Sequence, residues 1–137
     1  DQYHYKGDWI VRCDPKSGKS EIVVQGPVPK HCIPTSVLDP ERLIFYGGTA
    51  PGKDDDPLGI QFFAYDCKNK KLLYSGANGP PRYMIFANST GRVYWNIGKG
   101  DDGQLVRWDP EIGKPENIDG EIGIRAATQE TKDHKVY

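Results

Sequence analysis

The ten residues LVRWDPEIGK at positions 105–114 place a short apolar strand directly before an aspartate-led turn. Two other stretches repeat this pattern without gaps, IVRCDPKSGK at 10–19 and FFAYDCKNKK at 62–71. In each stretch the Asp can accept backbone N–H groups of the residues that follow, and in two of them Pro and Gly after it suit a tight turn. The apolar flanks have the composition of β-strands. We therefore predict three β-hairpins whose turns begin at the aspartates.

A second set of apolar segments lies between the hairpins: ERLIF at 41–45, GRVYW at 91–95 and HKVY at 134–137. Aligning Leu43, Val93 and Val136 gives spacings of 50 and 43 residues, and the three turn aspartates are spaced by 52 and 43. Two sets with about the same period indicate a structural repeat. Each full unit then holds four short antiparallel strands. They are predicted at 33–38, 43–46, 61–65 and 71–74, and again at 83–87, 92–95, 104–108 and 114–118.

This repeat resembles the blades of a β-propeller of the kelch-like or WD-repeat-like kind, and is similar to propellers of secreted bacterial proteins. The double glycine of kelch blades occurs at Gly47-Gly48. The resemblance implies an all-β chain, a propeller segment of about three four-stranded antiparallel blades that together form one domain over 1–137. Two blades are whole, at about 32–76 and 82–120. The third is split, with its outer strands at 1–26 and its inner strands at 124–137.

The composition agrees with many short strands joined by turns. Aromatic residues make up 11% of the 137 residues, and the chain holds 16 Gly and 11 Pro. The net charge of −1 gives no electrostatic basis for binding nucleic acid, and no apolar run is long enough to predict membrane insertion. Cys13, Cys32 and Cys67 have no C-x-x-C spacing, so neither a zinc site nor a disulfide framework is predicted.

Three blades are too few to close a ring, because propellers have four to eight. Open ends would leave bare strand edges and an uncovered apolar face. The predicted partners are therefore either the remaining blades of a parent propeller or identical subunits. The chain begins with Asp1 rather than Met, and together with the resemblance this predicts a secreted or periplasmic bacterial protein.

The innermost strand of a propeller blade lines the central channel, and its first residues lie at the rim. Counting back eleven positions from the aligned second strands gives Cys32, Arg82 and Arg125, with Lys30 and His31 beside the first of these. Converging guanidinium groups suit a carboxylate, sulfate or phosphate. The predicted ligand-binding residues are thus Arg82, Arg125, His31 and Lys30. The alternative is that both arginines form structural ion pairs.

Two acidic loops are predicted on the same rim. One contains Asp54, Asp55 and Asp56, and the other contains Asp101 and Asp102. These are candidate metal ligands, because Ca²⁺ needs several oxygen ligands, although solvated surface loops are an alternative and no cofactor is required.

No nucleophile–base motif stands out, and His31 is the candidate general base. The sequence favours a non-catalytic binding and assembly module. The alternative is a lyase or hydrolase acting on an anionic carbohydrate or a small acid at the channel mouth.

Overall fold

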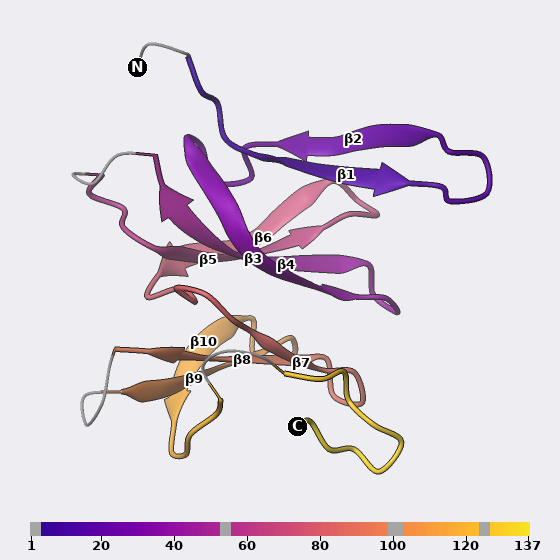
Figure 1. Ribbon diagram of the computed structural model, residues 1–137. Helices are drawn as coiled ribbons and strands as arrows, with labels where there is room; N and C mark the ends of the chain where they lie inside the picture. The colour runs from indigo at the N-terminus through magenta and orange to yellow at the C-terminus, as the bar shows by residue number, and fades with distance from the viewer. Residues whose placement is uncertain (1–3, 53–55, 99–102, 124–126) are drawn as a thin grey trace.

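The computed structural model describes residues 4–52, 56–98, 103–123 and 127–137, and Figure 1 shows them as stacked sheets joined by turns. The fold is all-β, and no helix occurs among these residues. The first sheet contains β1 (Trp9–Cys13) and β2 (Ser20–Gln25). The second contains β3 (His31–Asp39), β4 (Ile44–Pro51), β5 (Gln61–Asp66) and β6 (Lys71–Ala77). The third contains β7 (Ile85–Ala87), β8 (Arg92–Ile97), β9 (Gln104–Asp109) and β10 (Lys114–Ile118).

Each sheet is an antiparallel meander in which every strand pairs with the one that follows it in the chain. The orders are β1-β2, β3-β4-β5-β6 and β7-β8-β9-β10. The two four-stranded antiparallel sheets confirm the predicted fold class. Consecutive strands can pair in this way because the connections between them are short turns.

The three aspartate-led turns form as predicted. The Oδ1 atoms of Asp14, Asp66 and Asp109 each accept the backbone N–H of the residue two positions on, at 2.9, 2.9 and 3.0 Å. These contacts satisfy donors that the strand ladders leave unpaired. The repeat seen in the sequence is therefore a repeat of turn chemistry.

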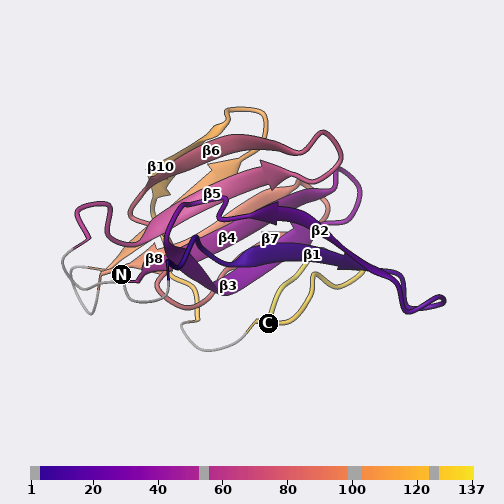
Figure 2. The same ribbon diagram turned by 90° about the horizontal axis from the view of Figure 1, so that it is seen from above.

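The sheets stack face to face, as Figures 1 and 2 show from two sides. The second and third sheets meet through a large aromatic cluster. Phe62 and Trp95 stack with ring centroids 4.4 Å apart, and Trp108 packs at 5.4 Å from Phe62. A smaller cluster of Ile10, Val28, Phe63 and Tyr65 joins the first sheet to the second. The core thus lies between the sheets, where inward side chains of both faces interdigitate.

The predicted alignment of the second strands is wrong by two residues. Phe45 lies opposite Tyr65 in β4–β5, and Val93 lies opposite Trp108 in β8–β9. Phe45, not Leu43, is therefore the equivalent of Val93. Leu43 instead matches Gly91, and their φ values are 55° and 69°. Leu43 looked like a strand residue by hydrophobicity, but it occupies a left-handed turn position and is 41% exposed.

Ion pairs recur at equivalent places in the sheets. Arg12 pairs with Glu21 across β1–β2, and Arg107 pairs with Glu116 across β9–β10, both at 3.1 Å. Arg92 on β8 reaches the buried Asp109 at the end of β9, at 2.7 Å. Each of these ion pairs joins neighbouring strands of one sheet.

Candidate functional site

A groove of about 600 Å³ runs along the first strands of the two larger sheets. Its apolar side is formed by Val37 and Leu38 of β3 and by Ile85 and Phe86 of β7. The segment 127–130 forms the opposite side. The first strands of the two larger sheets and the start of the carboxy-terminal hairpin therefore lie around one groove.

Glu130 anchors the carboxy-terminal hairpin beside this groove. Its Oε2 accepts the Ser89 backbone N–H at 2.7 Å, and its Oε1 lies 3.0 Å from His134 Nδ1. Hydrogen bonding from Ser89, together with His134, lowers the pKa of Glu130. The sequence reasoning missed this residue, because its partner in the β7–β8 turn is 41 positions away.

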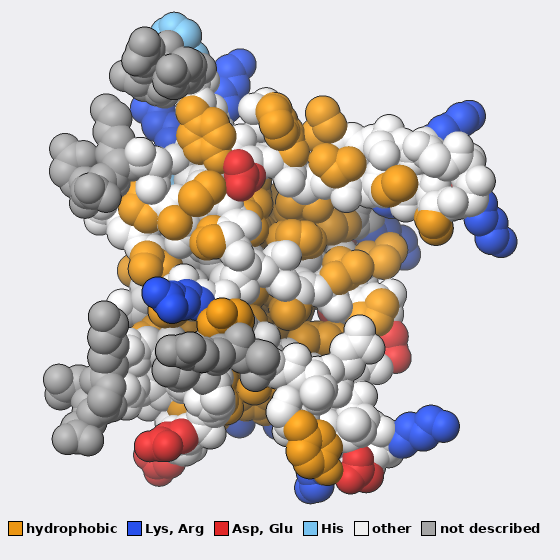
Figure 3. Space-filling model, viewed as in Figure 1, with side chains coloured by type: hydrophobic (Ala, Val, Ile, Leu, Met, Phe, Trp, Pro, Cys, Tyr) orange, Lys and Arg blue, Asp and Glu red, His pale blue; other side chains and the backbone are white. Residues whose placement is uncertain are grey.

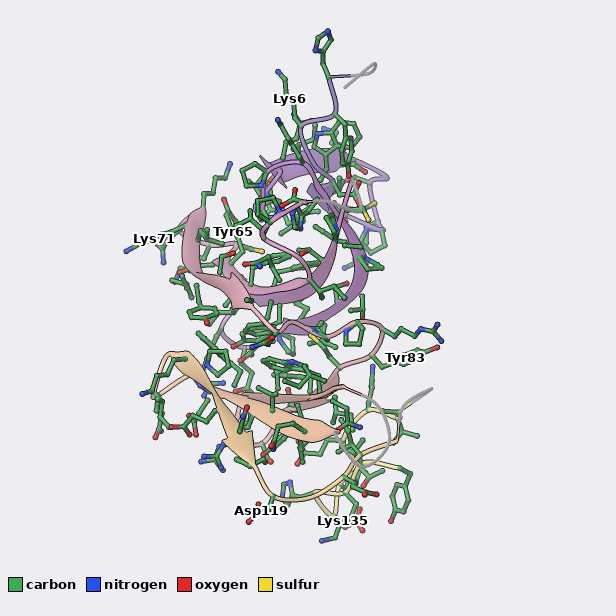
Figure 4. The ribbon with its side chains drawn as sticks, turned by 90° about the vertical axis from the view of Figure 1, so that its left-hand side faces the viewer. Lys6, Tyr65, Lys71, Tyr83, Asp119 and Lys135 are labelled. Atoms are coloured by element: carbon green, nitrogen blue, oxygen red, sulfur yellow. The ribbon has the colours of Figure 1, made fainter. Side chains whose placement is uncertain are left out.

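The predicted anion-binding residues are not joined to one another by hydrogen bonds or ion pairs in the described part of the chain. Arg82 is exposed on the connection between β6 and β7, and Lys30 is exposed with a φ of 63°. In Figure 4 the neighbouring Tyr83 points away from the sheets. Arg125 lies outside the described residues. An anion site built on these cations stays a prediction.

The equivalence of Cys32 with Arg82, which brought His31 and Lys30 into this set, is wrong. Val37 lies opposite Tyr46, and Ile85 lies opposite Tyr94 in the corresponding strands. Counting back along β3 and β7 from this pair makes Pro34 the equivalent of Arg82, whereas the sequence alignment had used Cys32. The difference follows from the two-residue error at Leu43.

His31 is buried, with its side chain fully shielded from solvent. Its Nδ1 lies 2.8 Å from Thr49 Oγ1, which also accepts the Gln61 backbone N–H at 3.1 Å. A hydroxyl has one donor and two acceptor sites, so Thr49 can bond the ring nitrogen and the Gln61 N–H at the same time. The Nε2 atom of His31 lies 3.5 Å from Asp56 Oδ2.

This cluster ties β3, β4 and β5 to the loop that precedes β5. Sequence reasoning singled out His31 and Asp56 separately, but their proximity is a through-space contact that no local pattern encodes. In this arrangement the imidazole has a partner for Nδ1 and a carboxylate near Nε2. A role as general base stays a prediction, and it would need a path from solvent to the ring.

Of the candidate metal ligands in the two acidic loops, only Asp56 lies within the described residues. Asp56 Oδ1 accepts the Leu58 backbone N–H at 2.9 Å, which is turn chemistry of the kind seen at the other aspartates. Asp54, Asp55, Asp101 and Asp102 lie outside the described residues. Within the described ranges no group of three or more His, Cys, Asp or Glu side chains could hold a metal ion. Calcium binding stays a prediction.

The β1–β2 sheet presents an uncovered apolar face, which we call the open face and define by Trp9, Val11 and Ile22. These side chains are 57%, 54% and 60% exposed, and Val11 lies directly opposite Ile22. Ile10, on the other side of the same strand, is 4% exposed. Figure 3 shows hydrophobic side chains gathered over this sheet. The sequence predicted an uncovered apolar face at the split blade, and strand alternation determines which residues form it.

No known protein family, curated protein or solved structure matches this chain. The interpretation of the open face therefore depends on its own chemistry. Large exposed apolar patches on a folded domain mark interaction surfaces.

Two further observations bear on the sequence predictions. No helix in the described ranges is long and apolar enough to cross a membrane. All three cysteines are free thiols: Cys13 is exposed on β1, and Cys32 and Cys67 are half-buried. Burial raises the pKa of the Cys67 thiol.

Proposed function

We propose that this chain is a non-catalytic binding and assembly module, a segment of a β-propeller that joins further blades through the open face of β1–β2. The observation that carries the proposal is the contrast between the two sides of β1. Ile10 is packed against the second sheet, whereas Val11 and its cross-strand neighbour Ile22 are more than half exposed. A sheet that has one apolar face covered and the other exposed lacks the neighbouring sheet that would pack on it.

The internal interfaces of the stack support this assignment. By the sequence repeat, Val11 corresponds to Phe63 in β5 and to Val106 in β9. Phe63 is fully buried between the first and second sheets, and Val106 is 3% exposed between the second and third. The position that is buried in two sheets is thus exposed in the sheet at the end. Covering this position would bury apolar surface, which contributes a favourable free energy of about 25 cal/mol per Å².

The free edge of β1 adds a second reason for assembly. In the described residues β1 pairs with β2 alone, so its other edge has backbone groups that can extend the ladder. Uncapped edges of this kind join other strands unless they are protected. We expect the open face and the open edge to be covered together, as they are in a complete blade.

The test compares Val11→Lys with the wild-type chain by sedimentation velocity over a range of concentrations. The wild type should associate as concentration rises, and Val11→Lys should weaken that association at least tenfold, because it places a charge in the middle of the covered area. Circular dichroism should be unchanged, since Val11 is 54% exposed in the single chain.

Leu73→Lys is the matched control, because Leu73 is a 44% exposed apolar residue on β6, outside the open face. It should associate like the wild type. A wild-type chain that remains monomeric at every concentration, or a Val11→Lys variant that associates normally, would contradict the proposal.

A further inference from the structure

We infer that a second copy of this chain covers the open face and edge, and that its residues 128–137 pair with β1 in a single register. This inference rests on the proposed function and names the partner. The pairing sets Val136 of one copy opposite Cys13 of the other. Each copy would complete the incomplete blade of its neighbour.

The carboxy-terminal turn contains a left-handed residue, as do the turns of the hairpins that begin the two larger sheets. The turns of those hairpins place Leu43 and Gly91 at φ values of 55° and 69°, and His134 has a φ of 60°. The Thr128 N–H donates to the Tyr137 carbonyl oxygen at 2.8 Å, which holds the two sides of the hairpin together. Aligning the three left-handed residues makes Val136 the equivalent of Phe45 and Val93.

The register then follows from the pairs already present. Phe45 lies opposite Tyr65, and Val93 lies opposite Trp108. The sequence repeat places Cys13 at the position of Tyr65 and Trp108. Val136 therefore belongs opposite Cys13.

Two neighbouring pairs agree with this register. Lys135 falls opposite Asp14, which puts opposite charges across the strands. Tyr137 falls opposite Arg12, and this repeats the pair that Tyr94 and Arg107 form between β8 and β9.

The backbone directions are also complementary. The Asp14 N–H donates toward β2, to the Lys19 carbonyl at 2.8 Å. Because successive residues of a strand direct their backbone groups to opposite edges, those of Cys13 face the open edge. The Tyr137 carbonyl accepts from Thr128, so by the same alternation the backbone groups of Val136 face outward. Each strand thus offers one donor and one acceptor at the residue where the pairing centres.

The two halves lie apart within one chain. Figure 1 shows β1–β2 and the carboxy-terminal segment at opposite ends of the stack, with both four-stranded sheets between them. Figure 4 likewise shows Lys6 and Lys135 at opposite ends. Two copies, each with three blades' worth of strands, would make a ring of six, within the range of four to eight that propellers have. Head-to-tail contacts between copies form a closed ring when the rotation that relates one copy to the next brings the last copy back to the first.

The experiment traps the pairing through the native thiol of Cys13. Neighbouring antiparallel strands hold opposite Cα atoms about 4.5–5.5 Å apart, within the range of a disulfide. The full chain carrying Val136→Cys should, after mild oxidation, form a covalent dimer of twice the 15.3 kDa chain mass. Peptide mapping should place the bridge between Cys13 and the thiol introduced at position 136, in most of the protein.

Two controls make the result specific. Lys135→Cys puts its thiol on the opposite face of the same strand, so it should form no bridge to Cys13. Val136→Cys combined with Cys13→Ser should form no such dimer, whichever other thiols are present. A bridge in the first control would overturn the register.

The remaining outcomes separate this inference from the proposed function. Association that is sensitive to Val11→Lys but gives no bridge in Val136→Cys would refute the strand pairing and leave the open face as the assembly surface. A wild-type chain that does not associate with itself would refute both. Association with the bridge at Cys13 would support both.

Discussion

Lys70 illustrates how one residue can depart from a repeat at a measurable cost. It is the fifth residue of an aspartate-led turn and has a φ of 53°, whereas the equivalent positions are Gly18 and Gly113, with φ values of 70° and 73°. A side chain in the left-handed region costs about 1 kcal/mol, which glycine avoids. We expect Lys70→Gly to raise the free energy of unfolding by about 1 kcal/mol in urea denaturation.

The control is Lys71→Gly, one position along. Lys71 is an exposed residue of β6, and glycine inside a strand lowers stability by about 0.5–1 kcal/mol. Opposite signs at adjacent lysines would establish that backbone conformation is the cause. The same sign at both positions would contradict the argument.

Asp109 gives the stability a dependence on pH. Burial alone would raise the pKa of Asp109, but hydrogen bonds from the Glu111 N–H and the Arg92 guanidinium outweigh it and the pKa is lowered. A carboxyl whose pKa is lower in the folded state contributes stability that is present above its unfolded pKa of about 3.9. That contribution is lost as the pH falls through the folded value.

We expect Asp109→Asn to lower the free energy of unfolding at pH 7 by about 2 kcal/mol, the usual value of hydrogen bonds to a charged group. Denaturation midpoints measured from pH 7 down to pH 2 should show the difference from the wild type shrinking as the wild-type carboxyl becomes protonated. A difference that is independent of pH would show that the charge of Asp109 does not matter.

At the scale of strands, β4 differs from its equivalent β8 by having glycine where β8 has a tryptophan. Gly47 occupies the position of Trp95, and the Phe63 ring lies over it. A Cβ at Gly47 would come within 2.2 Å of Phe63 Cε1, and that ring is fully buried. We expect Gly47→Ala to cost about 1–3 kcal/mol as overpacking, measured by thermal unfolding. Ser36→Ala, at the exposed partner of Gly47 in β3, should be nearly neutral.

The strands and turns could be predicted because their signals are local. An Asp that caps its own turn has the same effect wherever it occurs, and this located three of the turns, two of them also marked by Pro and Gly. The turn of β3–β4 uses the same chemistry: the buried Asp39 accepts the N–H groups of Glu41 and Arg42 at 2.9 Å. The pair Asp39-Pro40 is visible in the sequence and predicts a turn that extends to Leu43. Using it would have placed Leu43 in the turn instead of in a strand.

At the scale of the whole molecule, the contacts that organise the candidate site lie between segments far apart in sequence. The pairing of His31 with Thr49 and the anchoring of Glu130 by Ser89 need the sheets to be placed before they can be seen. The periodicity predicted that three blades would leave an apolar face for a partner to cover. Only the placement of Ile10 against the second sheet identified which face that is.

The two faces of β1 should therefore respond differently to the loss of apolar volume. Ile10 packs with Val28, Phe63 and Tyr65, so Ile10→Ala leaves a cavity and should cost about 2–5 kcal/mol. This cluster packs β1–β2 against the second sheet, where Asp8 also hydrogen-bonds to β3. The loss should therefore appear first as faster hydrogen exchange in β1 and β2. Amides of β5 and β9, whose side chains form the large aromatic cluster, should stay protected.

Val11→Ala is the matched change on the opposite face. In the single chain it should leave hydrogen exchange and unfolding nearly unchanged, since Val11 faces solvent there. At concentrations where the chain associates, the same substitution should weaken association and expose β1 to exchange. Equal destabilisation by both variants in dilute solution would mean that β1 has no open face. That result would also refute the proposed assembly surface.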